Sequence, residues 1–243
     1  ISLLADISWR VSFLVYLMGL ISIVLGPRGY QAGKRSKKLS FPGLMMYNKA
    51  IKEEAEQVIG LIEHLKIEKV NLLGTSGGAW VAVNTALKRP DLIDKVVADS
   101  FDGRTLHEEF AENLLRERAF AKQDLHARQF YEWCQGEDWE AVVDLNTQAL
   151  TKCAEDRIPL FGRPLEDLRT PVLFVGSAED EMCRRDMEEE YEQMSRLVQN
   201  GTVHMFKTGG HPAILTNAEL FAGVALNILA GRKTTLYRLT PLF

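Results

Sequence analysis

VNLLGTSGGAW, residues 70–80, is the stretch that decides the fold of this chain. Its first half is an apolar run typical of a buried strand, and a helical run begins directly after the glycines. Residues 74–78 fit the pattern G-x-S-x-G, whose serine, Ser76, lies on a tight turn from strand to helix with its hydroxyl pushed out above the sheet. The backbone N–H groups that open the helix, among them that of Gly77, would point at negative charge developing beside the serine.

The residues around this motif supply the context that it requires. Before it, apolar residues recur at helical spacing, at Ile51, Ala55, Val58, Ile59, Ile62 and Leu65. Residues 69–73 have the composition of a strand, and the helix predicted over 79–87 is stopped by Pro90. Helix, strand, G-x-S-x-G and helix in this order indicate a nucleophilic serine rather than a structural turn.

Length, composition and charge narrow the class of protein. A chain of 243 residues can bury a sizeable core in one domain, and 46% apolar with 26% charged residues is ordinary for a soluble globular protein. The net charge of −4 gives no reason to expect a nucleic-acid partner. Three cysteines, Cys134, Cys153 and Cys183, do not make a disulfide framework, so we expect free thiols and a cytoplasmic protein.

The sequence gives no signal for a metal or an organic cofactor. A membrane anchor on the apolar run 11–26, with the basic residues Lys34, Arg35, Lys37 and Lys38 after it, is a minor alternative. No group of His, Cys and carboxylate residues has metal-ligand spacing, and residues 74–78 lack the Lys-Ser/Thr that follows the glycines of a phosphate-binding loop. The apolar run 11–26 is shorter than the ~20 residues that a spanning helix needs. It divides at Gly19, which predicts a buried helix over 11–18 and a strand over 20–25.

Strands and helices alternate along the chain, which predicts a largely parallel α/β sheet. Further strands are expected at residues 1–5, 95–98, 172–176 and 202–206. An amphipathic helix is expected at 184–197, and a capping-box sequence at 216–219 should open a last helix that runs to about residue 230. Residues 104–167 are helical throughout and rich in charged and aromatic residues, so this insertion between two strands suggests a lid over the strand ends.

A serine hydroxyl needs a base to take its proton, and histidine suits this role because its pKa lies near 7. Of the five histidines, His211 is the one in a glycine-rich loop that follows a predicted strand. The carboxyl ends of parallel strands meet at one edge of the sheet, where binding sites form. We therefore expect His211 to lie beside Ser76 and to act as its general base.

The imidazole needs a carboxylate that fixes its tautomer and stabilises its charged form. Asp180 is favoured, because it follows the predicted strand 172–176 by about four residues. Glu179 and Glu181 flank it, so an error of one position stays open. Asp99 and Asp102 also follow a strand and are the main alternatives.

With these residues the chain resembles the α/β-hydrolase superfamily, which includes esterases, proline iminopeptidases and carbon–carbon bond hydrolases. Ser76, Asp180 and His211 follow one another in that family's order, and GPRGY at 26–30 is similar to its D-x-R-G-x-G turn with glycine in place of the Asp. The resemblance implies a mostly parallel sheet flanked by helices. It also implies a division into a core over residues 1–103 and 168–231, a helical cap over 104–167, and a tail at 232–243.

The resemblance implies an oxyanion hole as well. Family members carry His-Gly in the loop after the strand that precedes the first helix, and this loop supplies a backbone N–H; the present chain has LLADI at residues 3–7. The N–H of Ile7 would then be the second donor beside that of Gly77, because a backbone donor does not depend on its side chain. Asp6 places a carboxylate near the developing charge, which would oppose catalysis unless it points away.

The expected function is a serine hydrolase that cleaves an ester or related acyl bond of a small-molecule substrate. Trp80, Phe101, Trp133 and Trp139 are candidates for an apolar substrate pocket, with ordinary cap packing as the other interpretation of each. An aminopeptidase of the iminopeptidase type is an alternative that would need acidic cap residues to bind the substrate amine. A catalytically weak ligand-binding protein on the same fold is a second alternative, motivated by the altered loop at residues 5–7.

Overall fold

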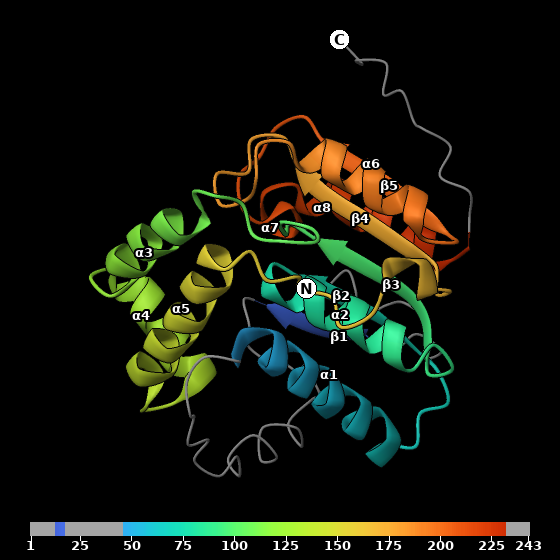
Figure 1. The fold of residues 1–243 in the computed structure, drawn as a ribbon, viewed down its shortest axis with the longest axis horizontal. Helices are drawn as coiled ribbons and strands as arrows, with labels where there is room; N and C mark the ends of the chain where they lie inside the picture. The colour runs from blue at the N-terminus through green and yellow to red at the C-terminus, as the bar shows by residue number, and fades with distance from the viewer. Residues whose placement is uncertain (1–12, 18–45, 232–243) are drawn as a thin grey trace.

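A computed structural model describes residues 13–17 and 46–231, and five parallel strands form one sheet in this part of the chain (Figure 1). The strand order in the sheet follows the chain, β1-β2-β3-β4-β5, and each strand pairs in parallel with the next. The strands are β1 Phe13–Leu17, β2 Val70–Thr75, β3 Ile93–Asp99, β4 Val172–Ser177 and β5 Gly201–Phe206. Parallel pairing directs all their carboxyl ends to one edge of the sheet.

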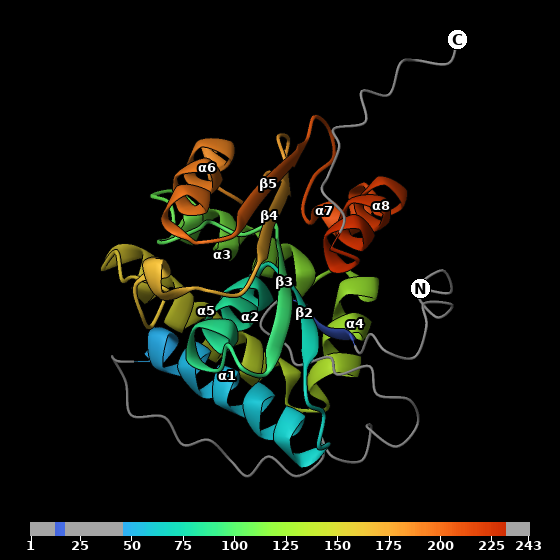
Figure 2. The same cartoon turned by 90° about the vertical axis from the view of Figure 1, so that its right-hand side faces the viewer.

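Helices cover both faces of the sheet (Figure 2). Neighbouring residues of a strand point to opposite faces, so in β3 Val96 belongs to one core and Val97 to the other. The larger core packs against α1 Met46–His64, α2 Gly77–Lys88 and α6 Met187–Leu197. The smaller core packs against the short α7 Ala213–Thr216 and the apolar α8 Ala218–Leu229.

Three further helices, α3 Phe110–Ala121, α4 Leu125–Gln135 and α5 Trp139–Glu155, lie between β3 and β4 in the chain. They group beyond the carboxyl ends of the strands, at the left of Figure 1. A short 3-10 helix, η4 Leu165–Asp167, leads the chain back toward β4. Leu114 and Leu150 tie these helices to the larger core, while Tyr131, Trp139 and Val143 form a small core among the helices themselves.

The strands predicted after the serine motif are all present, each within two residues of its expected limits. The helix predicted over 11–18 is wrong, because residues 13–17 form β1 and pair with β2 from Phe13 with Asn71 to Leu17 with Thr75. Its residues, FLVYL, are aromatic and β-branched for the most part and suit a strand beside another strand. The strands predicted at 1–5 and 20–25, Ile7 and the tail 232–243 lie outside the described residues.

The predicted capping box at 216–219 does not form, although the helix that it should open is present as α8. Thr216 is instead the last residue of α7, and its hydroxyl donates hydrogen bonds to the carbonyl oxygens of Gly210 and Pro212. Asn217 is the N-cap of α8 without a side-chain capping bond, because its amide donates to Ser177 Oγ and to the carbonyl of Thr208. Both side chains thus hold the loop that carries His211.

No helix in the described part of the chain is both long enough and apolar enough to cross a bilayer.

Candidate active site

Ser76 occupies the turn between β2 and α2 in a strained backbone conformation. Its φ of 54° lies in the left-handed region that non-glycine residues rarely adopt. A side chain at Gly74 would place its Cβ 2.1 Å from the carbonyl oxygen of Gly78, so the turn can be this tight only with glycine there. The N–H of Ser76 donates to the carbonyl of Asp99 on the neighbouring strand at 2.8 Å, which fixes the turn at the edge of the sheet.

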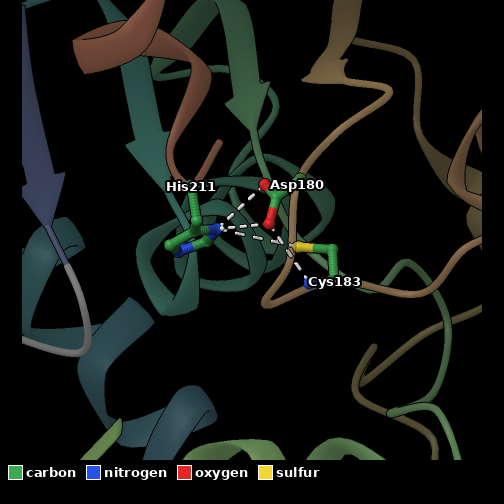
Figure 3. A group of neighbouring side chains, drawn as sticks. All are labelled: Asp180, Cys183 and His211. Atoms are coloured by element: carbon green, nitrogen blue, oxygen red, sulfur yellow. Dashed lines mark hydrogen bonds and ion pairs between the residues drawn. The ribbon is translucent and has the colours of Figure 1, made fainter. Parts of the chain in front are cut away.

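His211 and Asp180 come from the loops after β5 and β4 and form a close pair (Figure 3). Nδ1 of His211 lies 2.9 Å from Oδ2 of Asp180 and 3.1 Å from Oδ1. The backbone N–H groups of Met182 and Cys183 donate to the same carboxylate, at 3.0 and 3.2 Å. Four contacts therefore orient a carboxylate whose side chain is fully buried and an imidazole that is 7% exposed.

The pair is electrostatically coupled. Burial by itself lowers the pKa of His211, but the hydrogen bond and the charge of Asp180 outweigh it and raise that pKa above its ordinary value. Burial by itself raises the pKa of Asp180, but His211 and the two backbone N–H donors bring that pKa below its usual range. The ionised carboxylate holds the proton of the neutral ring on Nδ1 and leaves the Nε2 lone pair free to accept another proton.

The two glutamates that flank Asp180 contact the backbone of the His211 loop. Glu181 Oε2 accepts a hydrogen bond from the N–H of His211 at 3.2 Å, and Glu179 Oε2 accepts one from the N–H of Gly209 at 3.1 Å. A Cβ at Gly210 would lie 2.6 Å from Glu181 Oε2, so glycine allows this close approach. Three consecutive carboxylates thus hold one loop, and it is Asp180 that contacts the imidazole.

The two alternative acids, Asp99 as the last residue of β3 and Asp102 just after it, are engaged with other groups. Asp99 accepts hydrogen bonds from Thr75 Oγ1 at 3.2 Å, Ser100 Oγ at 3.0 Å and the N–H of Ile214 at 3.3 Å. It is fully buried, and burial raises its pKa to about 7, against the effect of these donors. Asp102 accepts from both the N–H and the Nδ1 of His107, at 2.9 and 2.6 Å, and so belongs to the start of the helical insertion.

A narrow cavity, partly open to solvent, joins these groups. Ser76, Gly77 and His211 border it on the side of the sheet, so the first helical N–H after the serine lies at the cavity as well. Its apolar walls are Trp80, Phe101, Phe110, Leu114, Leu150 and Met182. The structure therefore brings Ser76, Gly77, His211 and, through His211, Asp180 to one place.

Of the four predicted pocket residues, Trp80 and Phe101 line the cavity and the other two lie elsewhere. Trp80 Nε1 donates to the carbonyl of Gly103 at 2.7 Å, and its ring meets Phe101 edge to face. Trp139 stacks on Tyr131 with ring centroids 5.9 Å apart, inside the small core of the helical insertion, and Trp133 is 71% exposed.

Two polar residues of the helical insertion line the cavity without having been predicted, Arg118 on α3 and Asn146 on α5. Both stand among the many charged and polar residues of 104–167. Spacing places Arg118 four residues after Leu114, on the same face of α3, but it does not show that this face borders the cavity.

Asp180, Cys183 and His211 are the one group in the described residues whose atoms could hold a metal ion, with ligand atoms within 4.8 Å of one another. The donor set suits zinc by type. The His211 Nδ1 that such an ion would need is bound to Asp180, and Cys183 Sγ lies 3.8 Å from it (Figure 3). Burial and three nearby carboxylates raise the pKa of Cys183, which disfavours the thiolate that a metal requires.

Comparison with known proteins agrees with this architecture. A model of the alpha/beta hydrolase family matches residues 33–224. The protein named "Putative carbamate hydrolase RutD" from Caulobacter sp. (strain K31) is 25% identical over 200 residues, which cover 72% of this chain and 71% of the relative.

Solved structures with the same fold include serine hydrolase CCSP0084 from Cycloclasticus zankles, with a TM-score of 0.60 and 16% identity over 81% of this chain and 76% of that one. Another is the 2-hydroxy-6-oxo-6-phenylhexa-2,4-dienoate hydrolase of Rhodococcus sp. strain RHA1, with a TM-score of 0.55 and 17% identity over 80% of this chain and 75% of that one. The family match spans most of the chain, the sheet has the parallel order that the fold requires, and the chain therefore belongs to the alpha/beta hydrolase family.

Proposed function

We propose that this protein is a serine hydrolase that cleaves an ester, or a related acyl bond, of a small-molecule substrate through an acyl-enzyme on Ser76. The observation that carries the proposal is the shared cavity: a serine on a strained turn and a histidine paired with a buried carboxylate border the same space. A nucleophile, a base and a group that orients the base are what acyl transfer needs.

In the first half of the reaction, His211 Nε2 takes the proton of Ser76 while Oγ bonds to the carbonyl carbon of the substrate. The carbonyl oxygen gains the negative charge, and the N–H of Gly77 at the start of α2 donates to it. Asp180 stabilises the imidazolium that forms. When the carbon–oxygen bond to the leaving group breaks, His211 gives its proton to the departing alcohol.

In the second half, His211 removes a proton from water, and the resulting hydroxide attacks the acyl carbon. The second tetrahedral intermediate collapses, Ser76 takes back a proton from His211, and the carboxylic acid leaves. One ester and one water thus become one acid and one alcohol, and the protein returns to its starting state.

A carbamate is a second candidate substrate, and the same mechanism would cleave it. The relative from Caulobacter is named for a carbamate, in which the same carbonyl carbon bears a nitrogen. A serine–histidine–aspartate site can attack either carbonyl. We therefore include a carbamate beside p-nitrophenyl esters, and an aminoacyl arylamide for the iminopeptidase type, in the substrate panel.

Replacing Ser76 with Ala tests the proposal directly. We expect the variant to lose labelling by a fluorophosphonate probe and to lose p-nitrophenyl ester turnover by on the order of 10⁴-fold or more, because no other group would form the acyl-enzyme. Ser195→Ala, on α6 outside the cavity, makes the same chemical change and should keep both activities.

Undiminished labelling of the Ser76 variant would refute the assignment of the nucleophile. A wild-type protein that neither reacts with the probe nor turns over any member of the panel would instead support the ligand-binding alternative.

A further inference from the structure

We propose that the cavity beside Ser76 takes substrates whose chain ends in an anionic group, a carboxylate above all, and that Arg118 binds this group from the helical insertion. The inference rests on the proposed acyl-transfer function and names the class of substrate for it. Two observations carry it: a cation lines a cavity with largely aliphatic and aromatic walls, and one of that cation's donors is buried without a partner.

Arg118 is an unusual arginine for a surface helix. It lies on α3 and is only 7% exposed, whereas Arg116, two residues earlier, is exposed and pairs with Glu112 one turn away. A buried guanidinium is costly unless its five donors find acceptors. Its burial at the wall of a cavity therefore favours a role for its charge in binding a ligand.

The protein satisfies this guanidinium only in part. Arg118 Nη1 donates to the hydroxyl of Tyr131 and lies 3.3 Å from Glu117 Oε2, and the guanidinium carbon stands 5.3 Å from the centre of the Tyr131 ring. Among the described residues, none accepts a hydrogen bond from Arg118 Nε, and this nitrogen is closed off from solvent. A group that enters the cavity could supply the missing acceptor once the guanidinium turns to present Nε to it.

The rest of the cavity favours an anion over other acceptors. Apart from Arg118 and the thiol of Cys183, two ionisable side chains border the cavity, and both are already paired. Asp102 is paired with His107, and His211 is paired with Asp180. The walls between are aliphatic and aromatic and suit a hydrocarbon chain. Asn146 on α5 adds an amide at the side of the insertion, where its NH₂ could donate to the same ligand.

A carboxylate matches these donors in shape as well as in charge. The planar guanidinium presents Nε and a terminal nitrogen side by side, and a carboxylate accepts from both at once. A substrate with a scissile acyl group at one end and a carboxylate at the other would then span the cavity from Ser76 to α3. Half-esters and half-thioesters of dicarboxylic acids are the simplest members of this class.

The test compares matched pairs of substrates. p-Nitrophenyl monoesters of glutaric, adipic and suberic acid are paired with analogues that carry a neutral carboxamide in place of the distal carboxylate. For at least one chain length, we expect wild-type kcat/KM to be about 10-fold or more higher for the carboxylate. Equal kcat/KM values within every pair would overturn the proposal.

Arg118→Gln should remove this preference, mainly by raising KM for the carboxylate substrate, and should leave the carboxamide substrate within about 3-fold. Arg116→Gln removes the same charge from the exposed side of the same helix and should behave as the wild type. If Arg118→Gln lowers kcat/KM equally for both members of a pair, or keeps the preference intact, the arginine is not the anion site.

A second variant covers the case in which Arg118→Gln does not fold. Asn146→Asp is isosteric at a partly buried position and adds a negative charge to the cavity wall, so it should lower kcat/KM more for the carboxylate than for the carboxamide. An unchanged preference in this variant would contradict the anion site.

Binding to Ser76→Ala separates failure of the subsite from failure of the proposed chemistry. This variant cannot form the acyl-enzyme, yet monomethyl adipate should raise its Tm more than the matching adipamide ester does, and Arg118→Gln in the same background should abolish the difference. A carboxylate-specific Tm shift without turnover would retain the anion site and reject the proposed reaction. Turnover without any carboxylate preference would do the reverse.

Discussion

Glu179, Asp180 and Glu181 stand side by side after β4, and their carboxylates meet three different groups of the His211 loop. Only the side chain of Asp180 reaches the imidazole; its neighbours accept from the backbone N–H groups of Gly209 and His211. Spacing from the strand end shows that this acidic cluster lies in the loop after β4. It does not show which of the three carboxylates contacts the imidazole, because neighbouring side chains in a loop point in different directions. Which carboxylate contacts the ring depends on the path of the loop in space.

Glu181 is therefore a positioning residue for His211, and its two contributions can be separated. It accepts from the N–H of His211, and its charge adds to the raising of the pKa of His211. Glu181→Gln keeps the acceptor and removes the charge, so the pKa of His211 should fall. Since the neutral ring is the base in the proposed reaction, the acidic limb of the kcat/KM profile should move to lower pH with the plateau unchanged.

Glu181→Ala removes the acceptor as well, so the same shift should come with a plateau lowered by roughly 3- to 10-fold, because the ring is less well held. The measurements are the pH–rate profile and an NMR titration of the His211 ring, the latter independent of any substrate. Glu188→Gln, an exposed glutamate of α6, is the matched control. A ring titration that is the same in Glu181→Gln and Glu188→Gln would show that the charge does not act on His211.

At the scale of elements, the sequence alone identified some short apolar runs as strands, but it could not decide between strand and helix for others. β2, β3 and β4 are bounded by turn residues and stand between clear helices, so their limits were predictable. β1 lies inside a longer apolar run, where periodicity cannot distinguish a buried strand from a buried helix. What decides β1 is its pairing with β2, an interaction with residues more than fifty positions away in the chain.

The turn between β2 and α2 was predictable because its geometry depends on local backbone contact, and it yields a test with two glycines. At Gly74 an added Cβ would meet the backbone of Gly78 and Ala79, which cannot move without displacing α2. We expect Gly74→Ala to lower the free energy of unfolding by roughly 3 kcal/mol or more and to abolish reaction of Ser76 with a fluorophosphonate.

Gly60→Ala makes the same change in the middle of α1, at an exposed position with nothing within 4 Å of the new Cβ. It should raise the free energy of unfolding by about 0.5–1 kcal/mol, because alanine restricts the unfolded chain and favours helix. Urea unfolding of both variants measures the two values. If Gly74→Ala were as stable as the wild type, the close contact of strand and helix would not be what requires glycine.

At the scale of the whole molecule, the sheet edge was easier to predict than the helices that cover it. Parallel strands bring their carboxyl ends together whatever their side chains, so residues after β2, β4 and β5 had to converge. In residues 110–155 an apolar stripe can face the cavity or a neighbouring helix, and spacing does not decide which. Trp139 stacks on Tyr131 within the insertion, whereas Arg118, on a helix rich in charge, faces the cavity.

Asp99, buried at this edge of the sheet, should make the stability of the protein depend on pH. Its pKa is raised from the ordinary 3.8 to about 7, chiefly by burial, although Ser100, Ile214 and His211 oppose the shift. A carboxyl group with a raised pKa in the folded state binds a proton more tightly there than in the unfolded chain. Its contribution to stability is therefore complete below about pH 4 and is lost as the pH rises through about 7.

Asp99→Asn replaces this group with a neutral isostere that can still accept from Thr75 and Ile214. Relative to the wild type, the variant should gain roughly 2–3 kcal/mol in the free energy of unfolding between pH 5 and pH 8, at 1.36 kcal/mol per pKa unit. Urea unfolding at the two pH values measures this. Asp186→Asn is the control: Arg184 lowers the pKa of Asp186, so both pH values lie above its titration and its effect should be the same at each. An Asp99→Asn effect equally independent of pH would mean that Asp99 stays ionised in the folded protein, and that the donors around it, rather than burial, determine its charge.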